Sequence, residues 1–469
     1  MNSVGARRTG PFTASAALDA RTIERLAPAS LALILLYAGC LAVGNGPGNV
    51  LLAFLALSAL PIVALRPELR SRPLLIFSLL IILYLLAMAI RAELQGAPGR
   101  HLRAIDNYAF FAFAPFVAVH VAIALRYSLA FERLCLLAIT IMVAGASARL
   151  FWNADWGAGL SLFDRYQLGA GGGNRNYLSI EAGLTVLASG SLLVLAVAGG
   201  RWRWPARLIG GGILACVCAL AFLALLEMKS RNNWVALGAA GMVWLATLVI
   251  GSARRSGPRR SGLWATSLAF IGLVITGLVA FSSQIETRIS DNGGLIGNIE
   301  MFVRILMGTL DRSSVELQAY DPRVYLFVTA RELIAMKPWF GWGTDVGPLV
   351  AQHVGVKSLE VMIHFHNAYL EFLVGLGFAG TGLVTAHLAA VAFASRPRTS
   401  LPLDPDADAL LRALLAASLT YIGLVALAES ANRVELVTQT LVLIFALLLG
   451  RAGIGRAVDR IAGPAGRPQ

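Results

Sequence analysis

Charged residues are scarce in this chain of 469 residues. They make up 14% of it, whereas 57% of the residues are hydrophobic and the mean hydropathy is +0.71. A soluble protein has about 25% charged residues and needs polar side chains over much of its surface. The composition therefore excludes a soluble enzyme, a disordered chain and a secreted disulfide scaffold, and it indicates a membrane protein.

Lysine and cysteine are also rare. Lysine occurs only at Lys229, Lys337 and Lys357, so the formal net charge of +13 comes almost entirely from arginine. The four cysteines lie in apolar runs, and we interpret them as small hydrophobic residues rather than disulfides or metal ligands. The glycine-rich stretch 169–173 lacks the Gly-Lys-Ser/Thr ending of a phosphate-binding loop, so no nucleotide cofactor is expected.

Long apolar runs, in contrast, are abundant. Their unbroken character favours helices over the alternating ten-residue strands of a membrane β-barrel. The sequence therefore predicts an all-α polytopic membrane protein with about twelve transmembrane helices. The predicted spans are residues 27–45, 48–65, 73–90, 108–125, 134–151, 177–199, 207–227, 232–250, 263–282, 366–394, 409–428 and 436–450.

The basic residues sort by the side of the membrane. If both termini are cytoplasmic, 23 of the 39 Lys and Arg residues fall on cytoplasmic segments and nine on the short segments opposite. The positive-inside rule supports this orientation. The basic start at Arg7 and Arg8, without a cleavage site, predicts a retained cytoplasmic N-terminus. Most of the positive charge is thus explained by topology, and no nucleic-acid partner is expected.

One predicted connection is much longer than the others. We expect nine transmembrane helices in residues 1–282, an outer loop with short helices in 283–365, and three helices followed by a cytoplasmic C-terminus in 366–469. Residues 325–336 carry apolar side chains at three- and four-residue spacing, which predicts an amphipathic helix within the loop. Lys337-Pro338 is expected to end it.

Polar clusters lie at the outer ends of several predicted spans. An arginine can bind pyrophosphate oxygens with two parallel hydrogen bonds, and an imidazole can act as a general base on a hydroxyl. The alternative for each arginine is contact with lipid phosphate, and a lone interfacial histidine is often structural. Together the clusters favour a reaction with an anionic leaving group. The clusters are 174–177, 229–233, Arg323 and 364–367.

Four motifs, in this order along residues 170–385, resemble the O-antigen ligase/polymerase superfamily. The segment from Gly173 to Leu178 is similar to a Gly-Asn-x-Asn motif, and Ser230-Arg231 is similar to the family's Ser-Arg-Gly, with Asn232 in place of glycine. The third motif is Arg323 ahead of the Pro338–Gly343 turn, which is similar to the family's Arg-led helix and Pro-x-x-Gly-x-Gly turn. The fourth is His366-Asn367 followed by Gly377 and Gly380, which is similar to the family's His-Asn/Ser-x9-Gly-x-x-Gly signature.

The resemblance implies an inverting, metal-independent glycosyltransferase of GT-C-like architecture. By resemblance, it lies in the bacterial inner membrane with its active site facing the periplasm. The donor would be O-antigen on undecaprenyl pyrophosphate, and the acceptor a hydroxyl of lipid A–core. His366 would deprotonate that hydroxyl, while Arg231 and Arg323 would bind the pyrophosphate.

Further residues are assigned lesser roles. We expect Gly377 and Gly380 to permit close helix packing beneath an imidazole carried on top of the helix. Glu371 either orients the site or is a paired helix carboxylate. The remaining substrate-binding candidates are Arg175, Lys229, Asn174, Asn176 and Asn367.

Three other functions stay open at this stage. An O-antigen polymerase shares the donor but uses another lipid-linked glycan as the acceptor, and a protein O-oligosaccharyltransferase differs only in its acceptor. A transporter would be expected to place ionisable groups near the middle of the membrane. The strong polar clusters lie at outer helix ends instead, which favours interfacial chemistry.

Overall fold

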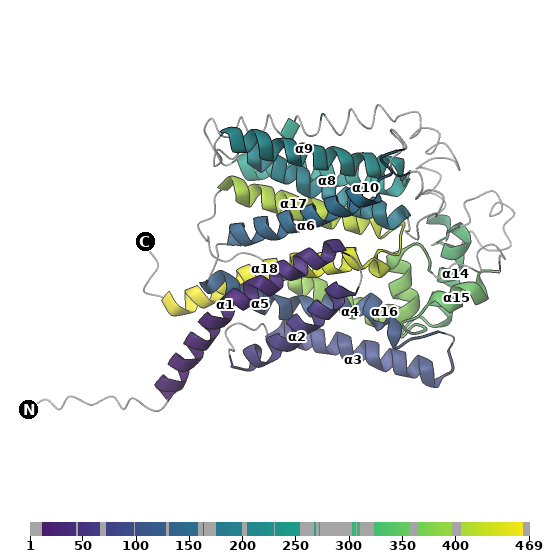
Figure 1. The fold of residues 1–469 in the computed structure, drawn as a ribbon. Coiled ribbons are helices and arrows are strands. Elements are labelled where there is room, and N and C mark those ends of the chain that lie inside the picture. The colour runs from purple at the N-terminus through teal and green to yellow at the C-terminus, as the bar shows by residue number, and fades with distance from the viewer. Residues whose placement is uncertain are drawn as a thin grey trace, which may run out of the picture.

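In the computed structural model, all regular secondary structure among the described residues is helical, as the sequence predicts (Figure 1). The described residues are 12–43, 46–65, 72–97, 99–127, 131–157, 163, 175–198, 204–228, 230–253, 267–268, 272, 303–305, 307–309, 323–355, 364–395 and 405–462.

The helices follow the apolar runs closely. Eleven of the twelve predicted spans coincide with a helix, whereas the span at 263–282 falls almost wholly outside the described residues. The main helices are α1 (Phe12–Val43), α2 (Pro47–Leu65), α3 (Arg72–Leu94), α4 (Asp106–Ala109), α5 (Ala114–Tyr127), α6 (Phe131–Asn153), α8 (Arg175–Ala198), α9 (Trp204–Glu227), α10 (Arg231–Ala253), α14 (Arg323–Met336), α15 (Gly347–His353), α16 (Ala368–Ala394), α17 (Pro405–Val425) and α18 (Glu435–Ala462).

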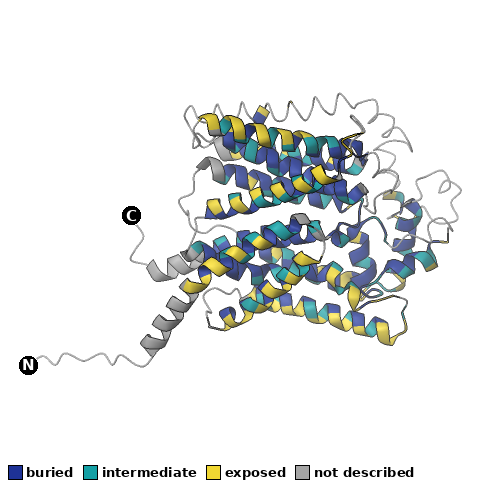
Figure 2. Cartoon of the chain, in the orientation of Figure 1, coloured by how far each residue is buried: buried dark blue, intermediate teal, exposed yellow. Residues whose placement is uncertain are grey.

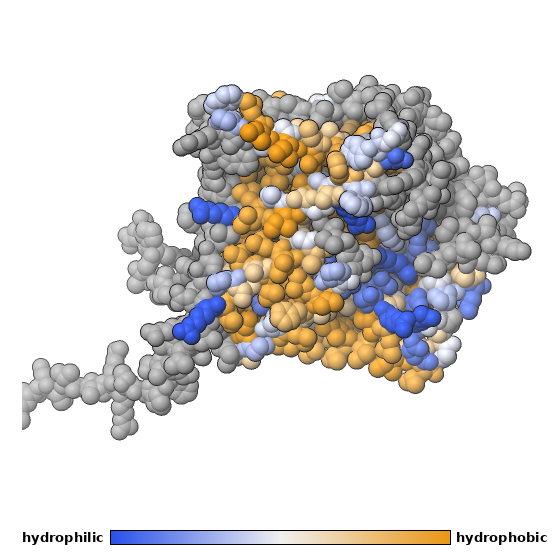
Figure 3. Space-filling view, viewed as in Figure 1, coloured by the Kyte–Doolittle hydropathy of each residue, from blue (hydrophilic) through white to orange (hydrophobic). Residues whose placement is uncertain are grey.

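Length and composition identify the chain as a polytopic membrane protein. Within the described residues, nine helical segments are long and apolar enough to cross a membrane. Two shorter apolar stretches, Arg25–Leu41 in α1 and Leu436–Ala452 in α18, add to them. Large apolar side chains such as Leu57, Leu79 and Ile250 are exposed on the outer helices (Figure 2). On the face shown in Figure 3, apolar side chains cover the middle of the bundle, which is the surface that lipid requires.

The helices form two packed groups. In the first, α10 packs against α17, and α8 packs against both α9 and α17. In the second, α5 contacts α1, α2 and α18, while α3 packs along α16. Helix α6 contacts α1 of one group and α8 of the other.

The two ends of the bundle differ. The start of α1 and the end of α18 lie at one end, and α14 and α15 lie at the other (Figure 1). Hydrophilic side chains gather on the surface near α14 and α15 (Figure 3). Helix α14 covers the amphipathic segment predicted at 325–336, and Leu326, Ala330 and Leu333 share a buried cluster with Leu370 and Val374 of α16. This packing fixes α14 on the N-terminal half of α16.

Candidate functional site

Helix α16 carries the predicted histidine motif, and it is interrupted at Gly377. The backbone of Gly377 has φ 64° and ψ −173°, a region that is essentially restricted to glycine. Inside a membrane, a broken helix must have its backbone groups satisfied by other parts of the protein. The sequence predicts close packing of Gly377 within a continuous helix, so the break corrects that expectation. At Gly380, a side chain would collide with the Tyr84 ring of α3.

The Pro338–Gly343 turn satisfies the interrupted helix. Gly341 and Gly343 have positive φ values, and a side chain on Gly341 would collide with the backbone of α16. The turn and the helix thus meet backbone to backbone. The hydrogen bonds run from Trp342 N to Val374 O (2.9 Å), Gly343 N to Gly375 O (2.9 Å), Phe378 N to Pro338 O (2.8 Å) and Ala379 N to Trp339 O (3.0 Å).

The N-terminal end of α16 begins with a capping asparagine. The Oδ1 atom of Asn367 accepts a hydrogen bond from Leu370 N at 3.0 Å, as an N-cap residue does. Its Nδ2 atom donates to Leu427 O at 2.8 Å, and Ala368 N donates to Ala426 O at 2.8 Å. Asn367 therefore ties the start of α16 to the loop between α17 and α18.

His366 precedes this cap and is not part of the helix. Its φ of 52° is the only positive value for a residue other than glycine among the described residues. Such a conformation is uncommon for a side chain of this size and is held by surrounding contacts. We expected the imidazole on top of the helix, and the structure places His366 directly before the N-cap of α16, with a left-handed backbone in place of a helical one.

The His366 ring is paired with a carboxylate. Its Nδ1 atom lies 3.2 Å from Oε2 of Glu429, in the loop between α17 and α18. The other carboxylate oxygen of Glu429 accepts a hydrogen bond from Nδ2 of Asn176 at 2.7 Å. Since Asn176 lies in the first turn of α8, the Glu429 pair joins three segments that are far apart in the sequence.

A second carboxylate, that of Glu371, lies at the same end of α16 and is fully buried. It accepts hydrogen bonds from Phe365 N (3.2 Å) and from the Ser430 hydroxyl. It also accepts from Nδ2 of Asn432 (3.3 Å) and Nε of Arg433 (2.8 Å). Glu371 is therefore a fully bonded carboxylate that fixes both the backbone before His366 and the loop that bears Glu429.

Burial and neighbouring charges shift the pKa values of Arg433 and His364. Burial lowers the pKa of Arg433, but Glu371, Tyr108 and Asp345 together outweigh burial and the net shift is upward, so the guanidinium stays charged. The rings of His364 and His366 meet edge to face, with centroids 4.0 Å apart. Burial and the neighbouring His366 lower the pKa of His364 to about 4, so His364 is neutral at physiological pH.

The arginine candidates are only partly described. Arg175, Arg231 and Arg323 are the first residues of α8, α10 and α14, but their side chains lie outside the described residues, as do Asn174 and Lys229 altogether. The start of α8 reaches the site through Asn176. Leu326, one turn after Arg323, shares a buried cluster with Phe365, the residue before His366.

The loop between α17 and α18 was not among the predicted site segments. Glu429, Ser430, Asn432 and Arg433 all contribute to the site. These residues form a polar cluster between two apolar spans, which is the same signal as the four clusters that were considered. In the described ranges, no group of three or more His, Cys, Asp or Glu side chains is arranged to hold a metal ion.

Part of this chain is similar to a known protein family. Residues 216–385 match the family model described as O-antigen ligase. The match covers less than half of the chain, and it shows that this segment is similar to O-antigen ligases. The match runs from α9 into α16, so it includes Arg231, Arg323, His366 and Gly377, and it ends before Glu429. A search of curated proteins gives no match to the chain.

This match indicates the general chemistry. It supports an O-antigen ligase- or polymerase-type glycosyl transfer in lipopolysaccharide biosynthesis, with lipid-linked polysaccharide substrates. The membrane-spanning fold agrees with substrates of that kind.

Proposed function

We propose that this protein is an O-antigen ligase that transfers O-antigen polysaccharide from undecaprenyl pyrophosphate to a hydroxyl of lipid A–core. The reaction would take place at the periplasmic face of the bacterial inner membrane, with both chain termini in the cytoplasm. The family match and the bundle with its termini opposite α14 and α15 support this proposal. The observation that carries it is the pairing of His366 with Glu429.

The pairing prepares His366 to act as a base. A carboxylate can only accept a hydrogen bond, so contact with Glu429 favours the tautomer with the proton on Nδ1. The lone pair is then on Nε2, where it can take the proton of an acceptor hydroxyl. Glu429 also stabilises the imidazolium that forms, which is the role of the carboxylate in other histidine-carboxylate pairs. His366 is thus the general base and Glu429 its positioning residue.

The bond changes are those of a single inverting displacement. The acceptor oxygen attacks the anomeric carbon of the donor sugar as its proton moves to Nε2 of His366. The bond between that carbon and the pyrophosphate oxygen breaks, and undecaprenyl pyrophosphate leaves with the electron pair. Attack from the side opposite the leaving group inverts the anomeric centre.

Positive charge near the leaving group would stabilise it as it departs. Arg231 and Arg323 are assigned this role, with Arg175 and Lys229 as additional cations. Support comes from their places in the chain, because each arginine begins a helix whose N-terminus also favours anions. No metal is required by this mechanism, since the guanidinium groups supply the charge.

The product formed in cells tests the acceptor. We expect the chain to restore a long O-antigen ladder on lipid A–core in a ligase-deficient strain that still makes the polymer. Free core with accumulated lipid-linked polymer would contradict ligation. Core carrying single repeats in a polymerase-deficient strain, converted to a ladder by the chain, would indicate polymerase activity, and glycosylated periplasmic proteins would indicate a protein acceptor.

A purified assay tests the metal-independent mechanism. The detergent-solubilised protein is mixed with the lipid-linked donor and lipid A–core, with and without EDTA. We expect equal rates, whereas loss of activity that added divalent metal restores would overturn a mechanism based on arginine alone.

A further inference from the structure

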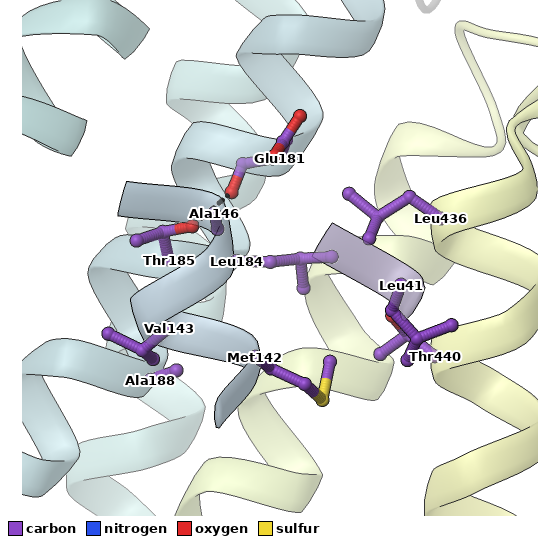
Figure 4. Close-up of a pocket in the computed structure, with 10 residues that line it drawn as sticks. All are labelled: Leu41, Met142, Val143, Ala146, Glu181, Leu184, Thr185, Ala188, Leu436 and Thr440. Atoms are coloured by element: carbon purple, nitrogen blue, oxygen red, sulfur yellow. Dashed lines mark hydrogen bonds between the residues drawn. The ribbon is translucent and has the colours of Figure 1, made fainter. Parts of the chain in front are cut away.

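An acceptor sugar needs hydrogen-bonding groups, and the interior of the bundle supplies few of them. The cavity lined by α1, α6, α8 and α18 is walled mainly by apolar side chains, among them Met142, Leu184 and Leu436 (Figure 4). A sugar hydroxyl placed there would lose its hydrogen bonds to water without replacing most of them. Polar side chains gather instead around His366, at the N-terminal end of α16.

His364 lies in this polar region, two residues before His366. Its ring meets that of His366 edge to face, with centroids 4.0 Å apart. Within the part of the chain that the structure describes, the Nδ1 atom of His364 is buried and has no hydrogen-bond partner. The residue as a whole is only partly buried, so the open edge of its ring is the one that carries Nε2.

The buried Nδ1 atom determines which nitrogen of His364 carries the proton. The low pKa of His364 leaves the ring neutral at physiological pH, so it has one N–H donor and one lone pair. A proton on Nδ1 would bury a donor without an acceptor, which proteins tolerate less well than an unused lone pair. The favoured tautomer therefore has its proton on Nε2, at the open edge of the ring.

The two neighbouring histidines therefore offer opposite groups. Contact with Glu429 keeps the proton of His366 on Nδ1 and leaves a lone pair on Nε2. The ring in contact with it, that of His364, presents an N–H at its own Nε2 atom. Adjacent hydroxyls on a sugar ring match this arrangement, because one can give its proton to His366 while the other accepts a hydrogen bond from His364.

We propose that His364 binds the acceptor sugar by donating a hydrogen bond from Nε2 to the hydroxyl next to the reacting one. This inference rests on the proposed function and adds a specificity-determining residue to it. Donation to the reacting oxygen itself would occupy a lone pair that is needed for attack on the donor sugar. By holding the neighbouring hydroxyl, His364 orients the reacting hydroxyl toward Nε2 of His366. An acceptor without that neighbouring hydroxyl would bind more weakly.

Two substitutions separate the hydrogen bond from the ring contact. His364→Gln keeps an N–H donor close to the position of Nε2 and removes the ring. His364→Phe keeps an aromatic ring against His366 and removes the donor. His353→Phe on α15 is the matched control, since the His353 ring contacts Trp342 and lies outside the proposed site.

The purified full-length variants are assayed with the lipid-linked donor and lipid A–core. For His364→Phe, we expect KM for lipid A–core to rise about tenfold, equivalent to about 1.4 kcal/mol of binding, while KM for the donor stays unchanged. His364→Gln and His353→Phe should stay close to wild type. A His364→Phe protein with the wild-type KM, or an equal loss in His364→Phe and His364→Gln, would overturn the proposal.

The acceptor can be changed as well as the protein. Synthetic core oligosaccharides that lack one hydroxyl next to the ligation position are compared with the complete acceptor. Removal of the hydroxyl that His364 binds should raise KM about tenfold for the wild type. It should cause no further rise in His364→Phe, because the two changes remove the same contact. Additive effects for every such acceptor would contradict the contact.

A measurement of the tautomers separates this inference from the proposed function. The full-length protein is labelled with ¹⁵N-histidine and studied in lipid bilayers by solid-state NMR, with His364→Phe and His366→Ala used to assign the signals. We expect a neutral His364 protonated on Nε2 beside a His366 protonated on Nδ1. A proton on Nδ1 of His364 would overturn the inference even if ligation is observed. The expected tautomers in a protein that ligates no acceptor would support the donor at His364 and contradict the proposed function instead.

Discussion

Two buried carboxylates lie at the same end of the bundle, and the protein surrounds them differently. Glu371 receives four hydrogen bonds, from the Phe365 backbone and from Ser430, Asn432 and Arg433. Glu429 contacts Asn176 and His366. All the bonding capacity of the first carboxylate is used by the fold. The second holds a titratable ring whose other nitrogen remains available for chemistry.

The contrast indicates that neighbouring residues of one short loop have different roles. Glu429 and Ser430 are consecutive residues, yet one binds His366 and the other binds Glu371. A charged group bonded on all sides contributes to folding, because any change leaves a buried partner unsatisfied. A charged group that orients a base contributes to rate. We therefore expect substitutions at the two carboxylates to separate stability from activity.

The largest expected effect is on catalysis, from His366→Ala. Loss of a general base should reduce the rate of ligation by about 10²–10⁴-fold. The unfolding temperature should fall little, because Glu429 keeps its hydrogen bond from Asn176 when the imidazole is removed. The rate is measured with purified protein and the stability by thermal unfolding in detergent. His353→Ala on α15 is the control, and equal rates in both variants would remove His366 as the base.

Glu371→Ala should have the largest effect on stability. It leaves the Arg433 charge buried without its partner, which costs about 3–5 kcal/mol. The variant should show poor yield and a much lower unfolding temperature, while the fraction that remains folded keeps measurable ligation. Glu371→Gln, which retains the shape, should lose less. A stable Glu371→Ala protein without activity would reverse the roles of the two carboxylates.

Glu429→Gln should show the opposite pattern. An amide can still meet Nδ1 of His366, but it no longer stabilises the imidazolium, so we expect about a hundredfold loss of rate. The unfolding temperature should stay close to that of wild type. The pair Glu429→Gln and Glu371→Gln, compared in the same rate and unfolding assays, forms the direct test. Parallel losses in both assays would show that the two carboxylates act as one unit.

The sequence predicts local features of this region well and distant ones poorly. Apolar runs identify eleven helices because a membrane-spanning helix satisfies its own backbone hydrogen bonds. His366 and Asn367 stand out through a local motif. The partners of Glu371 and His366, by contrast, lie 59 to 63 residues away in the sequence. Only the packing of α16 against the loop after α17 brings them together.

The break in α16 illustrates the same limit. A small-x-x-small pair predicts close packing of helices, and nothing local indicates that Gly377 has a conformation closed to other residues. The reason lies in the Pro338–Gly343 turn, whose backbone replaces the missing helical hydrogen bonds. A turn and a helix that are separate in the sequence determine this conformation together.

Gly377→Ala should therefore destabilise the contact between α16 and the Pro338–Gly343 turn, and with it the folded protein. The conformation at this position costs a residue with a side chain about 1–3 kcal/mol, and the added methyl group would also collide with the backbone of Trp339. We expect a lower unfolding temperature and a proportional loss of activity, with unchanged activity per folded molecule. Gly382→Ala is the control, because a side chain there meets nothing within 4 Å. Equal stability of the two variants would contradict the strained break.

The smallest expected effect is a pH dependence that arises at His364, whose pKa both carboxylates influence. Its pKa is about 4 in the folded protein, lowered by burial and by His366, against 6.5 for a free histidine. As the pH falls from 6.5 to 4, the unfolded chain takes up a proton that the folded protein does not. This histidine therefore lowers stability progressively over that range and contributes no pH dependence above it.

His364→Gln should make the unfolding temperature fall less between pH 7 and pH 5 than it does in the wild type, whereas His353→Gln should leave the slope unchanged. If His364→Gln retained the wild-type slope, the ring would already be protonated beside Glu371 and Glu429, and the two carboxylates would act on it more strongly than burial does.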